Sequence, residues 1–218
     1  MAALRSVIFD LDGTLVDVAG AAARCVGRIA AASKATEIDP AATRAAFRAA
    51  RSARARLASW VARTITSHGG RPPPTRAIAR ALRDVARDVE PDVRVVEVVA
   101  SVARTHRVAI VTNGPRDLQR AKLRAAGLAE LLPPSSVFVS GELGVRKPDA
   151  RIFRRALVAT GAPVEATLFV GDDEREDIEG ARALGMRTCR VAPAGTPTSA
   201  DERVEHVSAL PRVLACVT

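Results

Sequence analysis

The sequence contains no tyrosine, one tryptophan and five phenylalanines among 218 residues. Base-stacking platforms depend on aromatic rings, so their scarcity argues against a nucleic-acid-binding protein. No apolar run approaches the roughly 20 residues that a membrane helix requires, which argues against a membrane protein. The first residues lack the long apolar stretch of a secretory signal, so we expect a cytoplasmic protein.

Cysteine is also scarce. Cys25, Cys189 and Cys216 are odd in number and far apart, which favours neither a disulfide framework nor a zinc site. We expect them to be small core residues in a reducing compartment. With 48% hydrophobic and 26% charged residues, the composition is that of a globular protein, long enough for one domain with a modest insertion.

The positive charge of the chain is confined to one segment. The net charge is +9, and 30 arginines stand against three lysines. Residues 18–90 hold 14 basic and 5 acidic side chains, whereas the rest of the chain holds 19 of each. As the explanation of this charge, we favour a solvated, arginine-rich surface over nucleic-acid binding. A segment that raises the local concentration of anionic substrates explains it better than either.

Outside that segment, short apolar runs alternate with helical patterns. Strands are predicted over residues 7–9, 108–111, 137–139, 167–170 and 188–191, and helices over 93–105, 116–126, 149–160, 178–184 and 207–216. Such alternation indicates a parallel sheet covered by helices on both faces. The sequence therefore predicts an α/β, Rossmann-like core made of residues 1–17 and 91–218.

Residues 18–90 carry helical patterns without a strand signal. Helices are predicted over 18–33, from Asp39-Pro40 towards a break at 68–74, and over 75–90. On the middle helix, one side carries Phe47, Ala50, Leu57 and Val61, and another carries Arg44, Arg48 and Arg51. This segment is thus predicted to be an all-helical insertion after the first strand.

Polar residues gather where the predicted strands end. DLDGTLVD (10–17) follows the first strand, TNG (112–114) the second and GDDERED (171–177) the fourth, while KP (147–148) precedes a helix after the third. Ligands of open α/β sheets bind beyond these carboxyl ends. Four carboxylates, a hydroxyl and Lys147, one of only three lysines, are therefore expected to converge at one edge.

These four motifs, in this order, resemble those of the haloacid dehalogenase superfamily. The resemblance is to its phosphatase branch with a helical, C1-type cap after the first motif, and it covers essentially the whole chain. Each motif alone is equally an ordinary turn, cap or surface dipeptide. All four in order favour the family, whose fold implies a Rossmann-like core with residues 18–90 as the cap.

The resemblance implies a Mg²⁺ ion among the acidic residues. Its ligands would be a carboxylate oxygen of Asp10, the backbone carbonyl of Asp12 and the carboxylate of Asp172, which are the hard oxygen atoms that Mg²⁺ prefers. Asp177 would support the metal site from behind these ligands. Asp173 occupies a variable family position, and its role stays open.

The resemblance also implies how the phosphoryl group is handled. Asp10 would be the nucleophile, and Asp12 would protonate the leaving oxygen and then activate water. The Thr112 hydroxyl and the Asn113 backbone N–H would bind phosphoryl oxygens. Lys147 would pair with Asp10 and with the phosphoryl charge. An acid at Asp12 favours phosphate transfer over dehalogenation, since a halide leaves without a proton.

We therefore expect a Mg²⁺-dependent phosphatase acting on a small phosphorylated metabolite, with no nucleic-acid or membrane partner. Two alternatives remain: a phosphomutase acting on a sugar phosphate, and a non-catalytic protein that binds a phosphometabolite. Trp60 is expected in the core of the insertion and the arginines of its middle helix on a solvated face. The role of His68, the substrate and the oligomeric state stay open.

Overall fold

The computed structural model describes residues 3–50 and 54–216. Its contacts divide the chain into two compact units, one made of residues up to Val16 and from Pro91 onward, the other of Asp17–Glu90. We call them the α/β unit and the helical unit. Asp17 is the first residue of the helical unit, and its carboxylate caps the first helix by accepting a 2.9 Å hydrogen bond from the Gly20 N–H.

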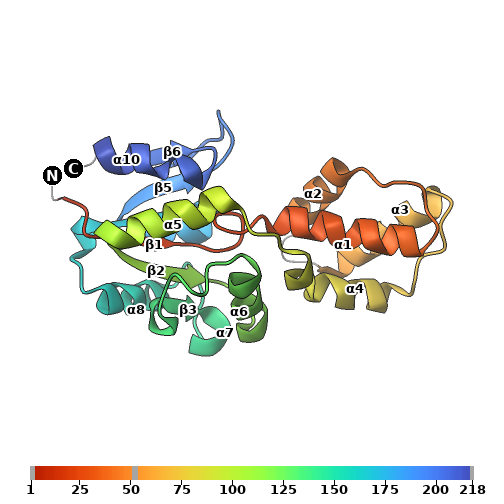
Figure 1. Ribbon diagram of the computed structural model, residues 1–218, viewed down its shortest axis with the longest axis horizontal. Coiled ribbons are helices and arrows are strands. Elements are labelled where there is room, and N and C mark those ends of the chain that lie inside the picture. The colour runs from red at the N-terminus through yellow and green to blue at the C-terminus, as the bar shows by residue number, and fades with distance from the viewer. Residues whose placement is uncertain (1–2, 51–53, 217–218) are drawn as a thin grey trace. The chain divides into compact units, whose positions relative to one another are not determined.

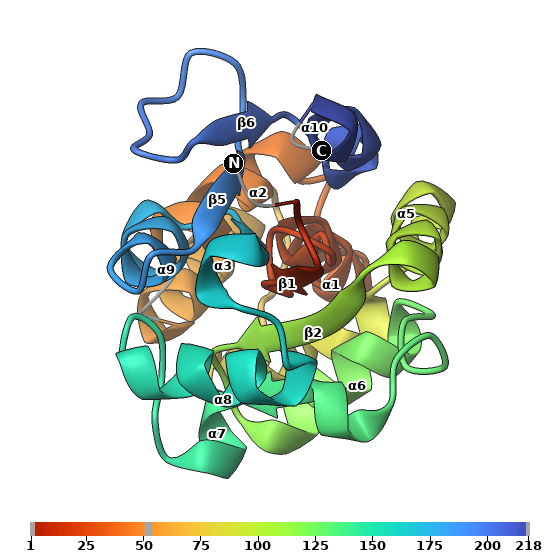
Figure 2. The same cartoon turned by 90° about the vertical axis from the view of Figure 1, so that its left-hand side faces the viewer.

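The α/β unit is built on one parallel sheet of six strands in the order β3-β2-β1-β4-β5-β6. The strands are β1 (Ser6–Phe9), β2 (Arg107–Thr112), β3 (Val137–Val139), β4 (Thr167–Gly171), β5 (Arg187–Val191) and β6 (Glu202–Val204). Helices lie on both sides of this sheet (Figure 2). The expected Rossmann-like fold is thus confirmed.

The α/β unit contains six α-helices among the described residues. They are α5 (Val93–Thr105), α6 (Arg116–Ala125), α7 (Ser140–Leu143), α8 (Ala150–Thr160), α9 (Gly180–Arg182) and α10 (Leu210–Cys216). On one face of the sheet, Ile8 and Phe169 pack with Ile152 and Phe153 of α8 in a fully buried cluster. The short strands β1 and β4, buried along their whole length, therefore lie at the centre of the core that carries the loops.

The helical unit consists of α1 (Val18–Ala32), α2 (Pro40–Ala49), α3 (Arg54–Ser67) and α4 (Thr75–Arg83), followed by a 3₁₀ turn at Val85–Asp88 (Figure 1). Val26, Val61, Ile65 and Ile78 are buried in its core, and Trp60 packs against this cluster as expected. Asp88 fastens the last turn to α1, because both its oxygens accept 2.7 Å hydrogen bonds from Arg28.

The predicted helices differ from the observed ones at several places. The single helix expected from Asp39 is two helices, α2 and α3; Arg51 lies outside the described residues. The helix expected over 75–90 ends at Arg83 and is followed by the 3₁₀ turn, in which Asp88 is bound to Arg28 of α1. The helix expected from Ile178 begins earlier, as a π-helical turn at Glu174–Glu179, and α7 was not predicted.

One strand was also missed. The edge strand β6 reads Glu-Arg-Val, with two exposed side chains, so it carries no apolar signal. It pairs with β5, and the Asp201 carboxylate next to it accepts hydrogen bonds of 2.8 Å from both the N–H and the hydroxyl of Thr188. Within the described residues, no helix is long and apolar enough to cross a bilayer.

Candidate active site

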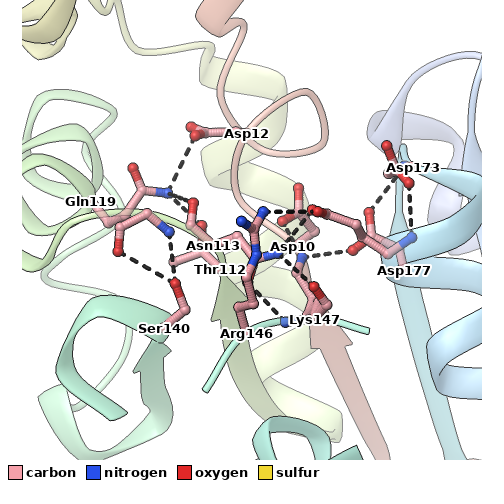
Figure 3. Close-up of polar contacts among 12 residues, drawn as sticks. Asp10, Asp12, Thr112, Asn113, Gln119, Ser140, Arg146, Lys147, Asp173 and Asp177 are labelled. Carbon is pink, nitrogen blue, oxygen red and sulfur yellow. Dashed lines mark hydrogen bonds and ion pairs between the residues drawn. The ribbon is translucent and has the colours of Figure 1, made fainter. Parts of the chain in front are cut away.

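The register of the sheet brings three motif loops together. Phe9, the last residue of β1, lies beside Ile110 of β2 and Val170 of β4. The chain then enters Asp10, whose N–H donates a 2.8 Å hydrogen bond to the Val170 carbonyl. The loops after β1, β2 and β4 therefore start at the same edge, where the polar side chains of Figure 3 gather.

Lys147 is the buried centre of this edge. Its Nζ donates to Asp10 Oδ1 at 2.5 Å and to Asp177 Oδ1 at 2.6 Å, and only 2% of its side chain is exposed. Burial alone would lower the pKa of Lys147, but the two carboxylates outweigh it and raise the pKa above its usual value. Lys147 is therefore a fixed positive charge between two aspartates.

Asp10 lies in a less favourable environment. Burial raises the pKa of its carboxyl well above the usual value, with further contributions from Asp177 and Asp172, and Lys147 only partly opposes this. Its Oδ2 atom is buried and finds no hydrogen-bond partner among the described residues. A carboxylate in this position needs further positive charge to stay ionised.

The acidic residues beside Asp10 fit a divalent cation. One carboxylate oxygen each from Asp10, Asp172 and Asp177 lies within 4.8 Å of the others. Asp177 already accepts from Lys147 through Oδ1 and from the Asp173 N–H through Oδ2, at 3.0 Å. The lone Oδ2 of Asp10 and the half-buried Asp172 are thus the better candidates for hard oxygen ligands.

Gly13 lets the first motif loop approach Asp172 closely. Its φ is +94°, a conformation that side chains disfavour, and an added Cβ would lie 2.4 Å from Asp172 Oδ2. From the sequence alone, Asp12-Gly13 predicts no more than an ordinary turn. The position of Gly13 between Asp12 and Thr14 was the available signal, because a turn here must bring backbone against the acidic loop after β4.

The Asn113 side chain joins three motifs. Its Nδ2 donates to the Lys147 carbonyl at 3.0 Å and to Glu176 Oε2 at 2.8 Å, while Oδ1 accepts from the Lys147 N–H at 2.9 Å. Glu176 in turn accepts from Arg146 at 2.9 Å. The family resemblance implies a role only for the Asn113 backbone N–H, and the sequence does not indicate Glu176 or Arg146 because their contacts are long-range.

Asp12 has its own basic partner, which sequence reasoning also missed. Asp12 Oδ2 accepts from Lys122 Nζ at 2.6 Å and from Gln119 Nε2 at 3.2 Å (Figure 3 shows the Gln119 contact). Gln119 also donates to the buried Thr112 hydroxyl oxygen, at 2.5 Å. The chain has only three lysines, and the rarity that drew attention to Lys147 could also have indicated Lys122.

The structure thus brings the anticipated residues to one edge. Asp10, Lys147 and Asp177 are in direct contact, Asp172 lies in the same acidic cluster, and Asn113 holds the Lys147 backbone. Asp12 and Thr112 share the Gln119 amide. Asp173 caps the π-helical turn, accepting from the Glu176 N–H at 2.8 Å, so its side chain has a structural task.

The site lies on a parallel α/β core and combines an aspartate after β1, a buried lysine and an acidic loop after β4. This combination is typical of a class of hydrolases with an acidic centre. A model of the haloacid dehalogenase-like hydrolase family matches residues 4–185. The chain belongs to this family.

The relatives that this chain resembles include phosphatases. It is 46% identical over 101 residues to a phosphoserine phosphatase of Thermus thermophilus. That alignment covers 44% of this chain and 40% of the relative. This chain is 34% identical over 95 residues to the pyrimidine 5'-nucleotidase YjjG of Escherichia coli, covering 43% and 41%. The matched regions thus span less than half the length of these curated relatives.

A solved structure matches nearly the full length. The HAD hydrolase YfnB from Bacillus subtilis, determined with bound magnesium, superposes with a TM-score of 0.75 at 20% identity. The match covers 98% of this chain and 99% of that one. At this identity the likeness establishes the shared fold.

Proposed function

We propose that this protein is a Mg²⁺-dependent phosphatase that hydrolyses a small phosphorylated metabolite through an aspartyl-phosphate on Asp10. One observation carries the proposal: Lys147 is buried between Asp10 and Asp177, while Asp10 Oδ2 lies unpartnered beside Asp172. A carboxylate that a buried lysine fixes through one oxygen, with its other oxygen open to a cation and a substrate, is equipped to attack an electrophile once the metal is bound.

Mg²⁺ would be held by Asp10, the Asp12 carbonyl and the Asp172 carboxylate, with Asp177 supporting the site through Lys147 and Asp173. When bound, the ion supplies the positive charge that offsets the repulsion between an anionic nucleophile and an anionic phosphate. The raised pKa of the buried Asp10 carboxyl supports this need for added positive charge.

In the first step, an oxygen of Asp10 forms a bond to phosphorus while the bond to the leaving oxygen breaks. Asp12 transfers its proton to that oxygen, so an alcohol departs and Asp12 becomes a carboxylate. The Thr112 hydroxyl, the Asn113 N–H and Lys147 would hold the phosphoryl oxygens.

In the second step, water attacks phosphorus and gives one proton to Asp12, and the bond from Asp10 to phosphorus breaks. Inorganic phosphate leaves, and both aspartates return to their starting states.

The helical unit, residues 17–90, is proposed to be the cap that selects the substrate. Residues 18–90 carry the whole excess positive charge of the chain, which would raise the local concentration of an anionic metabolite. Phosphoserine and pyrimidine nucleoside monophosphates, named for the relatives, are natural first members of a substrate panel.

Phosphomutase activity on a sugar phosphate is the second candidate. It would use the same aspartyl-phosphate and return the group to another hydroxyl of the sugar. Incubation with a sugar monophosphate separates the two, because isomerised product without free phosphate supports the mutase. A non-catalytic phosphometabolite-binding protein would bind the same compounds without releasing phosphate from any of them.

The decisive experiment is phosphate release from p-nitrophenyl phosphate by wild type and Asp10→Asn. We expect the variant to fall to the background rate, and EDTA to abolish wild-type activity until Mg²⁺ is restored. Asp39→Asn is the matched control: this exposed aspartate caps α2, and asparagine is an equally good cap. Activity persisting in Asp10→Asn would refute the mechanism.

A further inference from the structure

Two of the three lysines of this chain are buried, and each pairs with one aspartate of the first motif. Lys147 contacts Asp10, and Lys122 contacts Asp12 at 2.6 Å. Lys122 comes from α6, 110 residues along the chain from its partner. The chain otherwise uses arginine, yet Asp10 and Asp12 each pair with the compact ammonium group of a lysine.

The Lys122 side chain is 1% exposed, and Gln119, one turn earlier on α6, is fully buried. Lys122 Nζ donates to Asp12 Oδ2 and, at 2.9 Å, to Gln119 Oε1. Gln119 Nε2 then donates to the same Asp12 oxygen at 3.2 Å. The ammonium and the amide therefore hold one edge of the Asp12 carboxylate from two directions.

The other edge of Asp12 is free. Oδ1 is buried and finds no hydrogen-bond partner in the described part of the chain. An ammonium has only donors, so Oδ2, facing Lys122, is kept as an acceptor. The two oxygens of one carboxylate are thereby made different: Oδ2 is anchored, and Oδ1 is available to exchange a proton with another group.

We propose that Lys122, together with Gln119, is a positioning residue for Asp12, fixing Oδ2 so that Oδ1 gives the proton to the leaving oxygen and takes it back from water. This inference rests on the phosphatase function proposed above. It assigns Lys122 no contact with substrate or with the Asp10 nucleophile. Its effect on the reaction therefore runs through Asp12 alone.

The test compares two aryl esters in Lys122→Met. Nitrophenolate leaves readily without a proton, whereas phenolate, whose acid has a pKa of about 10, depends on one. We expect kcat/KM to fall at least about tenfold more for phenyl phosphate than for p-nitrophenyl phosphate. A loss of folded protein would lower both equally. Lys34→Met, which removes the exposed third lysine from the helical unit, should leave the ratio between the two kcat/KM values unchanged.

A double-mutant cycle identifies the route of the effect. In an Asp12→Asn background, Lys122→Met should change neither ester further, since its target has been removed. The measured ratio is kcat/KM for phenyl phosphate divided by kcat/KM for p-nitrophenyl phosphate. The inference is overturned if Lys122→Met leaves this ratio at the wild-type value. It is also overturned if Lys122→Met lowers the ratio in the Asp12→Asn background as much as in the wild type. Wild type that releases no phosphate, or Asp10→Asn that remains active, refutes the proposed function instead.

A structural measurement on the wild type needs no variant, and it stands in if Lys122→Met does not fold. In crystals with vanadate, a phosphate mimic, Asp12 Oδ1 should face the vanadate oxygen opposite Asp10 while Oδ2 stays on Lys122. An Asp12 that leaves Lys122 and turns Oδ2 to the vanadate overturns the proposal.

Discussion

Replacing Lys147 with methionine removes the central charge of the site and should destabilise the α/β unit strongly. Methionine keeps the length and the apolar stem, so the change is mainly the loss of the ammonium group from Asp10 and Asp177. The ammonium also lies 5.6 Å from the Phe169 ring centre, and that cation–π contact is lost as well.

The magnitude follows from burial. All three side chains are at most 7% exposed, so solvent screens their interaction little. Removing one partner of a buried ion pair costs about 3–5 kcal/mol. For a unit of this size, that corresponds to a fall in melting temperature of roughly 6–20 °C, as measured by circular dichroism without metal. Lys34→Met serves as the matched control, with about 0.5 kcal/mol or less expected.

The pH dependence of the stability lost in Lys147→Met provides a second test. Burial already raises the pKa of Asp10 above its unfolded value, and removing Lys147 raises it further. A carboxyl with a raised pKa in the folded state destabilises increasingly as pH rises from its unfolded value, near 4, towards the folded one. Lys147→Met should thus lose less stability at pH 5 than at pH 7. Equal melting of variant and wild type at pH 7, or a larger loss at pH 5, would refute this reasoning.

Three further outcomes are expected. Mg²⁺ at about 100 times its Kd should stabilise the wild type by about 2.7 kcal/mol in a thermal melt at pH 7 but leave Asp10→Asn nearly unshifted; equal shifts would place the ion elsewhere. Gly13→Ala should lower metal affinity in a titration, since its Cβ would displace Asp172 and a left-handed alanine costs about 1–2 kcal/mol; unchanged affinity would contradict this. Asn113→Ala should cost about 1–3 kcal/mol in denaturant unfolding, because the Lys147 N–H loses its partner; Asn113→Asp keeps the acceptor and should cost less for that contact.

Residues that carry chemistry in short motifs were the predictable part of the site. Asp10, Lys147 and Asp177 could be expected together because strand ends of a parallel sheet share one edge. The short apolar runs before these motifs predicted the strands, because strands of a parallel sheet are buried on both faces. Here local pattern and three-dimensional arrangement agree, so the motifs locate the site.

The contacts that organise the motifs were not predictable, because their partners are distant in sequence. Lys122 lies on a helix whose pattern says only that some residues face inward, and its pairing with Asp12 depends on how α6 docks. Glu176, which accepts from Asn113, lies in a π-helical turn at Glu174–Glu179, where the sequence predicts a helix only from Ile178. The polar edge strand β6 was missed because pairing with β5, not apolar content, holds it.

Asp10 and Asp12 stand two residues apart in the sequence, yet their environments differ. Asp10 is almost fully buried, shares Lys147 with Asp177 and lies in the acidic cluster that suits a cation. The Asp12 side chain is 26% exposed and is held on one edge by Lys122. Carboxylates of identical chemistry take different roles when their surroundings differ. In the proposed mechanism, the two buried lysines, as much as the aspartates, would distinguish the nucleophile Asp10 from the proton carrier Asp12.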